Sequence, residues 1–123
     1  LYGLLLFLFA LTLSTSRAPT QLEEVINRGE LRVITLMGST TYFQNAKGEG
    51  GFEYWLASAF AEYLGVELKM TPRESVSGAI IAIGGPLGDM AAAGLTVTPQ
   101  RQKALRFSEP YYEVTQKLIY RNV

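Results

Sequence analysis

The sequence has no cysteine and no histidine, and each absence removes a class of chemistry. Without cysteine the chain has no disulfide, no thiolate metal site and no thiol nucleophile. Without histidine it lacks the commonest general base and the commonest metal ligand. Carboxylates remain as acid–base groups, but four of them, Glu53, Glu62, Glu109 and Glu113, form no close set typical of a catalytic pair. We therefore expect no catalytic residue, no metal and no cofactor in these 123 residues.

The chain also lacks an excess of charge of either sign, because 11 basic residues balance 11 acidic ones. A protein that binds nucleic acid usually carries a basic excess, so we expect no nucleic-acid partner. No glycine-rich phosphate loop is present either. The length, with 48% hydrophobic residues, suits about one domain.

Residues 1–13 are almost wholly apolar, but a membrane-spanning helix needs about 20 such residues. This length suits the core of an export signal, since a polar linker, residues 14–20, follows directly. The alternative is a buried core helix. The initiating methionine and the basic leader of a signal are missing, so we expect a chain truncated at its front. Residues 1–20 are interpreted as a signal or anchor segment with its linker, and residues 1–13 as a candidate membrane tether.

Strand and helix patterns alternate after the linker, which is typical of an α/β domain whose mostly parallel sheet is flanked by helices. The clearest helix covers residues 52–64, where Phe52, Leu56, Phe60 and Leu64 recur with helical spacing. The predicted elements, in chain order, are helix 21–28, strand 31–36, loop 37–51, helix 52–64, strand 66–71, helix 74–83, strand 90–94, helix 99–104 and strand 111–120.

Two polar loops follow predicted strands on the same edge of this sheet. Ligands of open parallel sheets bind beyond the carboxyl ends of the strands, so these loops are predicted to form a site. The residues concerned are Thr40, Thr41, Tyr42 and Phe43 after the first strand, and Thr96, Thr98 and Arg101 after the third.

The second of these loops predicts a corner that binds a carboxylate. A strand ends at Gly94, and a short helix follows with Thr98 as its cap and Pro99 in its first turn. Such a helix start leaves backbone N–H groups free, which favours an anion. Arg101 adds a planar, two-pronged donor that suits a carboxylate.

Each of these residues also has an interpretation without a ligand. Arg101 would be a solvated helix arginine, and Thr96 would satisfy backbone groups of the turn. Tyr42 and Phe43 would pack on their own lobe instead of forming a pocket wall. Trp55 is predicted to cover the interface between helix and sheet.

Five short motifs give these residues a context: Arg28-Gly29-Glu30-Leu31-Arg32-Val33, Gly51-Phe52-Glu53, Tyr63-Leu64-Gly65, Gly94-x-Thr96-x-Thr98-x-x-Arg101 and Phe107-Ser108-x-Pro110-Tyr111. Together they resemble the amino-acid type of extracellular solute-binding proteins, family 3. The resemblance implies that residues 21–123 form the first lobe of a type II periplasmic binding protein fold, with the second lobe missing.

The same resemblance implies a role for each candidate site residue. Arg101 would grip the carboxylate of an amino acid or peptide. Gly94 would offer its carbonyl to an ammonium group, and Thr96 would supply a hydroxyl and an N–H. Tyr42 and Phe43 would wall the side chain of the ligand.

A narrower likeness lies in five segments, which resemble the N-terminal module of the membrane-bound lytic murein transglycosylase F family. They are residues 19–23, 40–42, 51–54, 91–102 and 110–121. In that family a two-lobed binding module precedes a lysozyme-like domain that cleaves peptidoglycan glycan strands. The resemblance implies an exported, ligand-sensing lobe in the bacterial periplasm that binds an amino acid or muropeptide and lacks its partner domains. The alternatives are the substrate-binding component of an amino-acid ABC transporter or sensor, and a small-molecule enzyme on the same fold.

Overall fold

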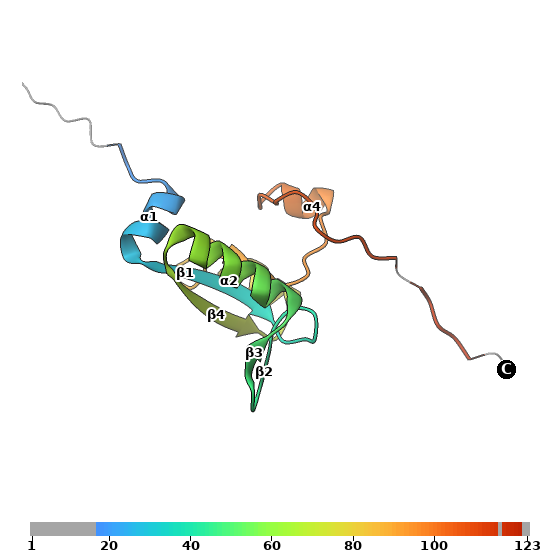
Figure 1. Ribbon diagram of the computed structural model, residues 1–123. Helices are drawn as coiled ribbons and strands as arrows, with labels where there is room; N and C mark the ends of the chain where they lie inside the picture. Colours follow the sequence, from blue (N-terminus) through green and yellow to red (C-terminus); the bar gives the residue numbers. More distant parts are fainter. Residues whose placement is uncertain (1–16, 116, 122–123) are drawn as a thin grey trace, which may run out of the picture.

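The computed structural model describes residues 17–115 and 117–121. The apolar segment 1–13, predicted as an export signal, lies outside these residues. Among the residues described, no helix combines the length and the apolar character needed to cross a membrane. Figure 1 shows the elements, which are in chain order α1 Gln21–Arg28, β1 Glu30–Leu36, β2 Phe43–Asn45, β3 Gly48–Gly50, α2 Phe52–Leu64, β4 Glu67–Arg73, α3 Val76–Ala82, β5 Met90–Ala91 and α4 Pro99–Gln102.

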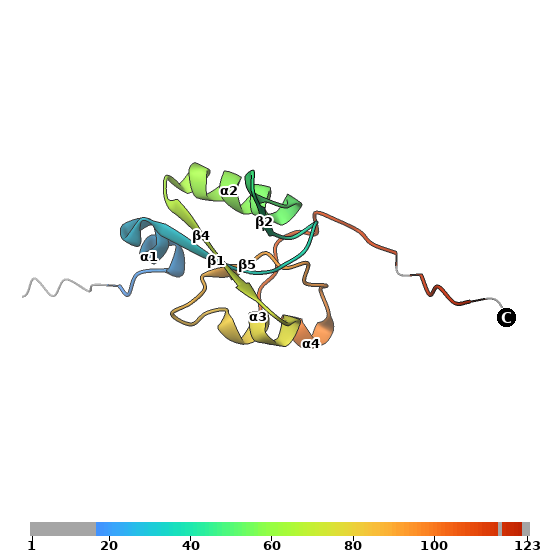
Figure 2. The ribbon, with the colours of Figure 1, turned by 90° about the horizontal axis from the view of Figure 1, so that it is seen from below.

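Three parallel strands in the order β4-β1-β5 form the central sheet, which confirms the predicted α/β arrangement. The middle strand β1 pairs with β4 over its whole length, whereas β5 pairs with β1 only at Met90 and Ala91. Figure 2 shows α2 on one face of this sheet and α3 on the other. The sheet is therefore covered on both sides, as expected for parallel strands.

The alternation of side chains along β1 builds a small core on each face of the sheet. Leu31 and Val33 point to the face that α1 and α2 cover, and Ile34 points to the face that α3 covers. The first cluster contains Val25, Leu31, Val33, Ala57, Ala61 and Ala92, and the second contains Ile34, Ala79 and Ala82.

Local signals set the ends of α1 and α2, and both helices have the predicted bounds. Thr20 and Glu23 form a capping box, in which each side chain accepts a backbone N–H of the other residue. Gly29 and Gly65 end the two helices in the left-handed conformation, with φ of 74° and 70°, which glycine adopts without strain.

The face of α2 that packs on the sheet is not its most apolar face. Glu53, Ala57 and Ala61 are at most 4% exposed, whereas Phe52 is 50% exposed and Trp55 is 61% exposed. The prediction that Trp55 covers the interface between helix and sheet is wrong. Its ring lies on the solvent side and packs edge-on against Tyr54, with 5.1 Å between the ring centroids.

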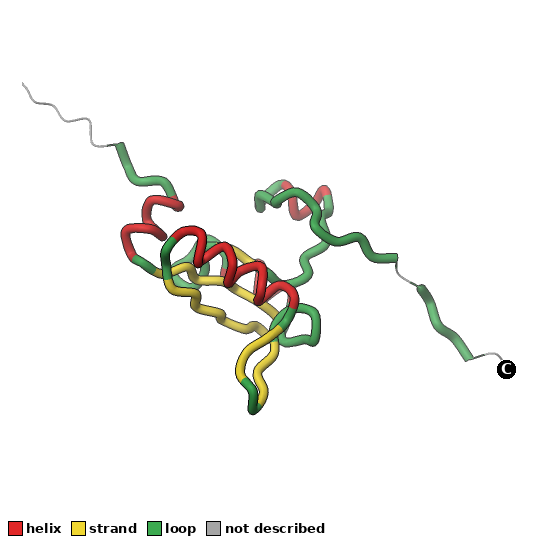
Figure 3. Tube along the Cα trace, viewed as in Figure 1, coloured by secondary structure: helices red, strands yellow, loops and turns green. Residues whose placement is uncertain are grey.

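The structure corrects three further predicted elements. Residues 111–115 and 117–120 form no strand, because no strand among the described residues pairs with them, and Figure 3 shows these residues as loop. The predicted loop 37–51 contains the antiparallel hairpin β2–β3. The third strand of the sheet is two residues long, and α3 begins at Val76 behind its cap Ser75.

Candidate ligand-binding site

The loops that follow β1 and β5 meet at the carboxyl edge of the sheet, as the sequence predicts. Gly94 has a left-handed φ of 60°, and a Cβ built on it would lie 3.8 Å from the Thr41 Cγ2 atom. The Thr41 hydroxyl is anchored in turn, because it donates to the Leu36 carbonyl at 2.6 Å. Thr41 and Gly94 are therefore neighbours although they are far apart in the sequence.

The N–H group of Gly94 faces inward and binds a buried carboxylate. It lies 2.9 Å from Glu53 Oε1 and 2.8 Å from Oε2, and the Glu53 residue is only 4% exposed. The Tyr111 hydroxyl donates to Oε1 of the same carboxylate. Burial, together with this hydrogen bond to Glu53, raises the pKa of the Tyr111 phenol. One carboxylate thus joins α2, the loop after β5 and the segment after α4.

Two backbone hydrogen bonds connect the start of α2 to the loop after β1. The Glu53 N–H donates to the Thr40 carbonyl at 3.2 Å, and the Tyr54 N–H donates to the Thr41 carbonyl at 3.1 Å. Gly51 permits this approach, since a Cβ on it would overlap the Thr41 carbonyl oxygen. These two amides of α2 are consequently not free to bind an anion.

Arg101 and Thr96 are brought together in the segment that follows Gly94. Arg101 Nη1 donates to the Thr96 carbonyl at 2.9 Å, and the residue is half-buried. Within the described part of the chain, the other guanidinium nitrogens form no hydrogen bond or ion pair. The guanidinium therefore keeps donors that a carboxylate would accept.

The predicted helix cap at Thr98 is confirmed, because its hydroxyl accepts the Arg101 N–H at 3.2 Å. The Thr98 carbonyl accepts the Gln102 N–H at 2.9 Å. With α4 only four residues long, few backbone donors remain free at its start. A carboxylate at this corner would depend on side chains more than the sequence predicts.

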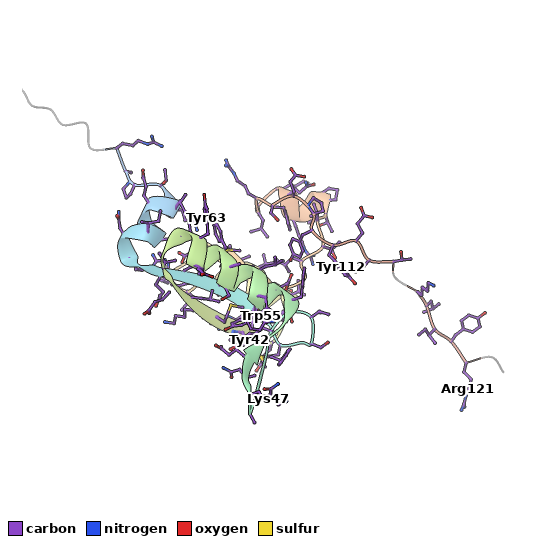
Figure 4. The ribbon with its side chains drawn as sticks, viewed as in Figure 1. Tyr42, Lys47, Trp55, Tyr63, Tyr112 and Arg121 are labelled. Carbon is purple, nitrogen blue, oxygen red and sulfur yellow. The ribbon has the colours of Figure 1, made fainter. Side chains whose placement is uncertain are left out.

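Tyr42 and Phe43 lie at the hairpin β2–β3, beside the N-terminal end of α2, where Figure 4 labels Tyr42 and Trp55. Tyr42 is 3% exposed, and its hydroxyl donates to the Glu49 carboxylate. Burial, followed by this hydrogen bond, raises the pKa of Tyr42 to about 12. The Phe43 ring packs over Gly50. These contacts belong to the lobe itself, and the proposed contact of either ring with a ligand stays a prediction.

The roles of Glu53 and Tyr111 do not follow from the sequence analysis, which names both only as members of family motifs. It also finds no catalytic pair that includes Glu53, and it places Tyr111 on a strand. A signal is present in α2, where Glu53, Ala57 and Ala61 recur every four residues and so share one face of the helix. The small side chains of Ala57 and Ala61 let α2 pack closely on the sheet, and this packing also buries the Glu53 carboxylate on the same face of the helix. Among the described residues, no cluster of three or more acidic side chains is arranged to hold a metal ion.

A three-stranded parallel sheet with helices on both faces and polar loops at its carboxyl edge defines a lobe of a type II periplasmic binding protein. Residues 31–123 match the family of bacterial extracellular solute-binding proteins, family 3. The chain belongs to this family.

Within this family, the chain is similar to proteins that share one name. The chain is 47% identical, over 99% of its length, to "Membrane-bound lytic murein transglycosylase F" of Saccharophagus degradans, and it spans 24% of that protein. It is 49% identical, over 84% of its length, to the protein of the same name from Ectopseudomonas mendocina, and it spans 21% of that protein. The chain thus covers about a quarter of the length of these relatives.

Solved structures give the same fold. An ancestral cationic amino acid solute-binding protein, AncCDT-1, superposes with a TM-score of 0.70 and 36% identity, over 76% of this chain and 41% of that one. The arginine-bound form of domain 1 from TmArgBP superposes with a TM-score of 0.66 and 33% identity, over 72% of this chain and 71% of that domain.

Proposed function

We propose that this chain is a ligand-sensing lobe of a peptidoglycan lytic transglycosylase and that it binds the carboxylate of an amino acid or peptide. The ligand would lie at the carboxyl edge of the sheet, between Gly94, Thr96 and Arg101. Tyr42 and Phe43 would border its side chain from the neighbouring loop. Binding there would regulate a catalytic domain elsewhere in the full-length protein during cell-wall turnover.

The observation that carries the proposal is the position of the Arg101 guanidinium. One nitrogen is fixed 2.9 Å from the Thr96 carbonyl, which orients the planar group beside the loop that follows β5. Its remaining donors match the two oxygens of a carboxylate. The solved domain 1 from TmArgBP supports an amino acid as the ligand, because that isolated domain has arginine bound.

Two sets of relatives favour two different parent proteins. The two lytic murein transglycosylases described above are 47% and 49% identical to this chain, whereas the two amino-acid-binding structures are 36% and 33% identical. The higher identity supports the transglycosylase. The second candidate, a substrate-binding component of an amino-acid ABC transporter or sensor, is favoured by the amino-acid-binding proteins among the solved neighbours.

The proposed location is the cell envelope. Membrane-bound relatives and membership of an extracellular family support export to the periplasm. We propose the apolar segment 1–13 as the tether, with the outer membrane as its target. Replacement of residues 1–16 of the full-length protein by a cleavable export signal should release it into the soluble periplasmic fraction, and retention in the membrane fraction would contradict the tether.

Calorimetry on the full-length protein tests the site. L-Arginine and a free cell-wall stem peptide serve as probes, and both carry carboxylates. Arg101→Ala should weaken binding of the probe that the wild type accepts by at least about tenfold, which corresponds to 1.4 kcal/mol. Arg106→Ala is the matched control, since Arg106 is exposed and lies five residues further along. Equal affinity of the Arg101→Ala and Arg106→Ala variants would contradict the proposed site.

The parent activity needs a separate measurement. The full-length protein should release anhydro-muropeptides from purified cell wall, and the rate should change when the preferred probe is added. A full-length protein that binds the probe and releases no anhydro-muropeptide would favour the transport or sensor receptor instead.

A further inference from the structure

One carboxylate holds both ends of the segment that contains Arg101. The Gly94 N–H donates to the two oxygens of Glu53 at 2.9 Å and 2.8 Å, and the Tyr111 hydroxyl donates to Oε1 of the same side chain. Residues 94–111 are therefore closed into a loop on the first turn of α2. This loop includes α4 and the whole predicted carboxylate corner.

Between its two ends, the loop has few other attachments to the lobe. Among the described residues, every hydrogen bond made by residues 95–110 stays inside that stretch. None of residues 94–111 is buried. A segment with so few buried contacts opens locally at low free-energy cost. The bonds to Glu53 are therefore the hydrogen bonds that fix the position of Arg101 relative to the sheet.

Tyr111 is the last attachment at the C-terminal end of the loop. Its ring packs on Phe52, with 6.0 Å between the ring centroids, and its hydroxyl reaches the buried Glu53 carboxylate. The described residues beyond it, 112–115 and 117–121, are all exposed and form no hydrogen bond with the rest of the lobe. Closure of the loop at this end thus depends on one side chain.

We infer that Tyr111 is a positioning residue of the ligand site, because its hydrogen bond to Glu53 keeps residues 94–111 closed and thereby keeps Arg101 in place. The inference rests on the proposed function, which places a ligand between Gly94 and Arg101. Such a ligand contacts both ends of the corner only while the loop is closed. Ligand binding and loop closure therefore stabilise each other.

Two neighbouring tyrosines provide a matched pair of variants. Tyr111→Phe removes the hydroxyl that binds Glu53 and keeps the ring that packs on Phe52. Tyr112→Phe makes the same chemical change at a residue that is 72% exposed and that Figure 4 labels on the segment leading away from the lobe. A difference between the two variants isolates the hydrogen bond to Glu53.

The experiment is limited trypsin proteolysis of the full-length protein, with the peptides identified by mass spectrometry. Cleavage after Arg106, an exposed residue inside the loop, reports loop opening, and cleavage after Lys47, between β2 and β3, is the internal control. Tyr111→Phe should raise the initial rate after Arg106 at least about fivefold over Tyr112→Phe, because cleavage follows the population of the open form. The rate after Lys47 should be the same in both variants.

The same assay with a bound probe tests the coupling to the ligand site. The probe is L-arginine or the stem peptide, whichever the wild type binds in calorimetry. At ten times its Kd, the probe should slow cleavage after Arg106 about tenfold and leave cleavage after Lys47 unchanged. The Lys47 rate also corrects for any effect of the probe on trypsin. A tyrosine that only stabilised the fold would not make the loop respond to the probe.

The outcomes separate the two proposals. If neither probe binds the wild type, or if binding persists in Arg101→Ala, the proposed site is wrong, and the inference fails with it. If binding depends on Arg101 but both tyrosine variants are cleaved after Arg106 at the same rate, only the inference is overturned. Equal rates after Arg106 with and without the probe would also overturn it, and this comparison needs only the wild type if Tyr111→Phe does not fold.

Discussion

Arg32 and Asp89 form a paired contact, with Nη2 of the arginine 2.7 Å from Oδ1 and Nε 3.1 Å from Oδ2. The Arg32 backbone N–H also donates to Oδ2, at 2.8 Å, and Arg28 reaches the same oxygen at 2.6 Å. The Asp89 side chain is only 6% exposed. Burial alone would raise the pKa of Asp89, but the bonds from Arg32 and Arg28 outweigh it and lower the pKa below its ordinary value.

Asp89→Asn should destabilise the protein by about 2 kcal/mol at neutral pH, because two guanidinium groups lose a charged partner. The lowered pKa gives this effect a pH dependence. Its stabilisation is present above the unfolded pKa, about 3.9, and is lost as the pH falls through the folded pKa. Urea unfolding followed by circular dichroism should therefore show a difference between wild type and variant that shrinks below about pH 4. Glu62→Gln, at an exposed acid, is the control. A difference that stays constant down to pH 2 would contradict this account.

Gly51→Ala should be more damaging than Gly48→Ala. Both glycines have a positive φ, 123° and 117°, so each alanine meets backbone strain of about 1–3 kcal/mol. A Cβ at Gly51 would also overlap the Thr41 carbonyl oxygen, whereas one at Gly48 has nothing within 4 Å. The overlap should add about 1–3 kcal/mol to the loss of unfolding free energy. Equal losses in the two variants would show that the loop after β1 does not press on Gly51.

Thr35→Val should cost about 1–3 kcal/mol of unfolding free energy although it keeps the shape of the side chain. Thr35 is fully buried, and its hydroxyl donates to the Ala92 carbonyl at 2.6 Å, which ties β1 to the segment after β5. Valine would leave that carbonyl unsatisfied. Thr71→Val on β4 is the control, since the Thr71 hydroxyl has no hydrogen bond within the described residues. The account fails if the two substitutions have the same effect.

Ala61→Leu and Ala59→Leu test which face of α2 is buried. Ala61 is 2% exposed and packs in the core of the sheet, so a larger side chain should cost about 1–3 kcal/mol. Ala59 lies on an exposed position of the same helix, and the same change should stay within about 0.5 kcal/mol. The opposite ranking in urea unfolding would mean that the apolar residues Phe52 and Leu56 face the sheet after all.

Much of the fold was predictable because its signals are local. The capping box at Thr20 and the glycines at 29 and 65 fixed the bounds of two helices. Alternating strand and helix patterns predicted the parallel sheet. The errors in the predicted strands have one cause in common, which is that a strand depends on a partner. Residues 111–120 have a strand-like pattern without a pairing strand among the described residues, and β2 and β3 exist because they pair with each other.

The candidate site was predictable in outline but not in its chemistry. Topology places Thr41 and Gly94 at one edge, and the structure confirms that they are neighbours. Which donors are already used depends on contacts between distant segments, such as the 41 residues that separate Glu53 from Gly94. No spacing in the sequence reveals that the Gly94 N–H is occupied, so the buried carboxylate was found only in the structure.

The hydrogen bonds from Glu53 and Tyr54 to the carbonyls of Thr40 and Thr41 have a thermodynamic consequence. They attach the loop after β1 to the first turn of α2, so that loop cannot rearrange unless these hydrogen bonds break. A ligand that binds beside Gly94 therefore contacts a loop that is already ordered, and binding costs little additional conformational entropy of that loop.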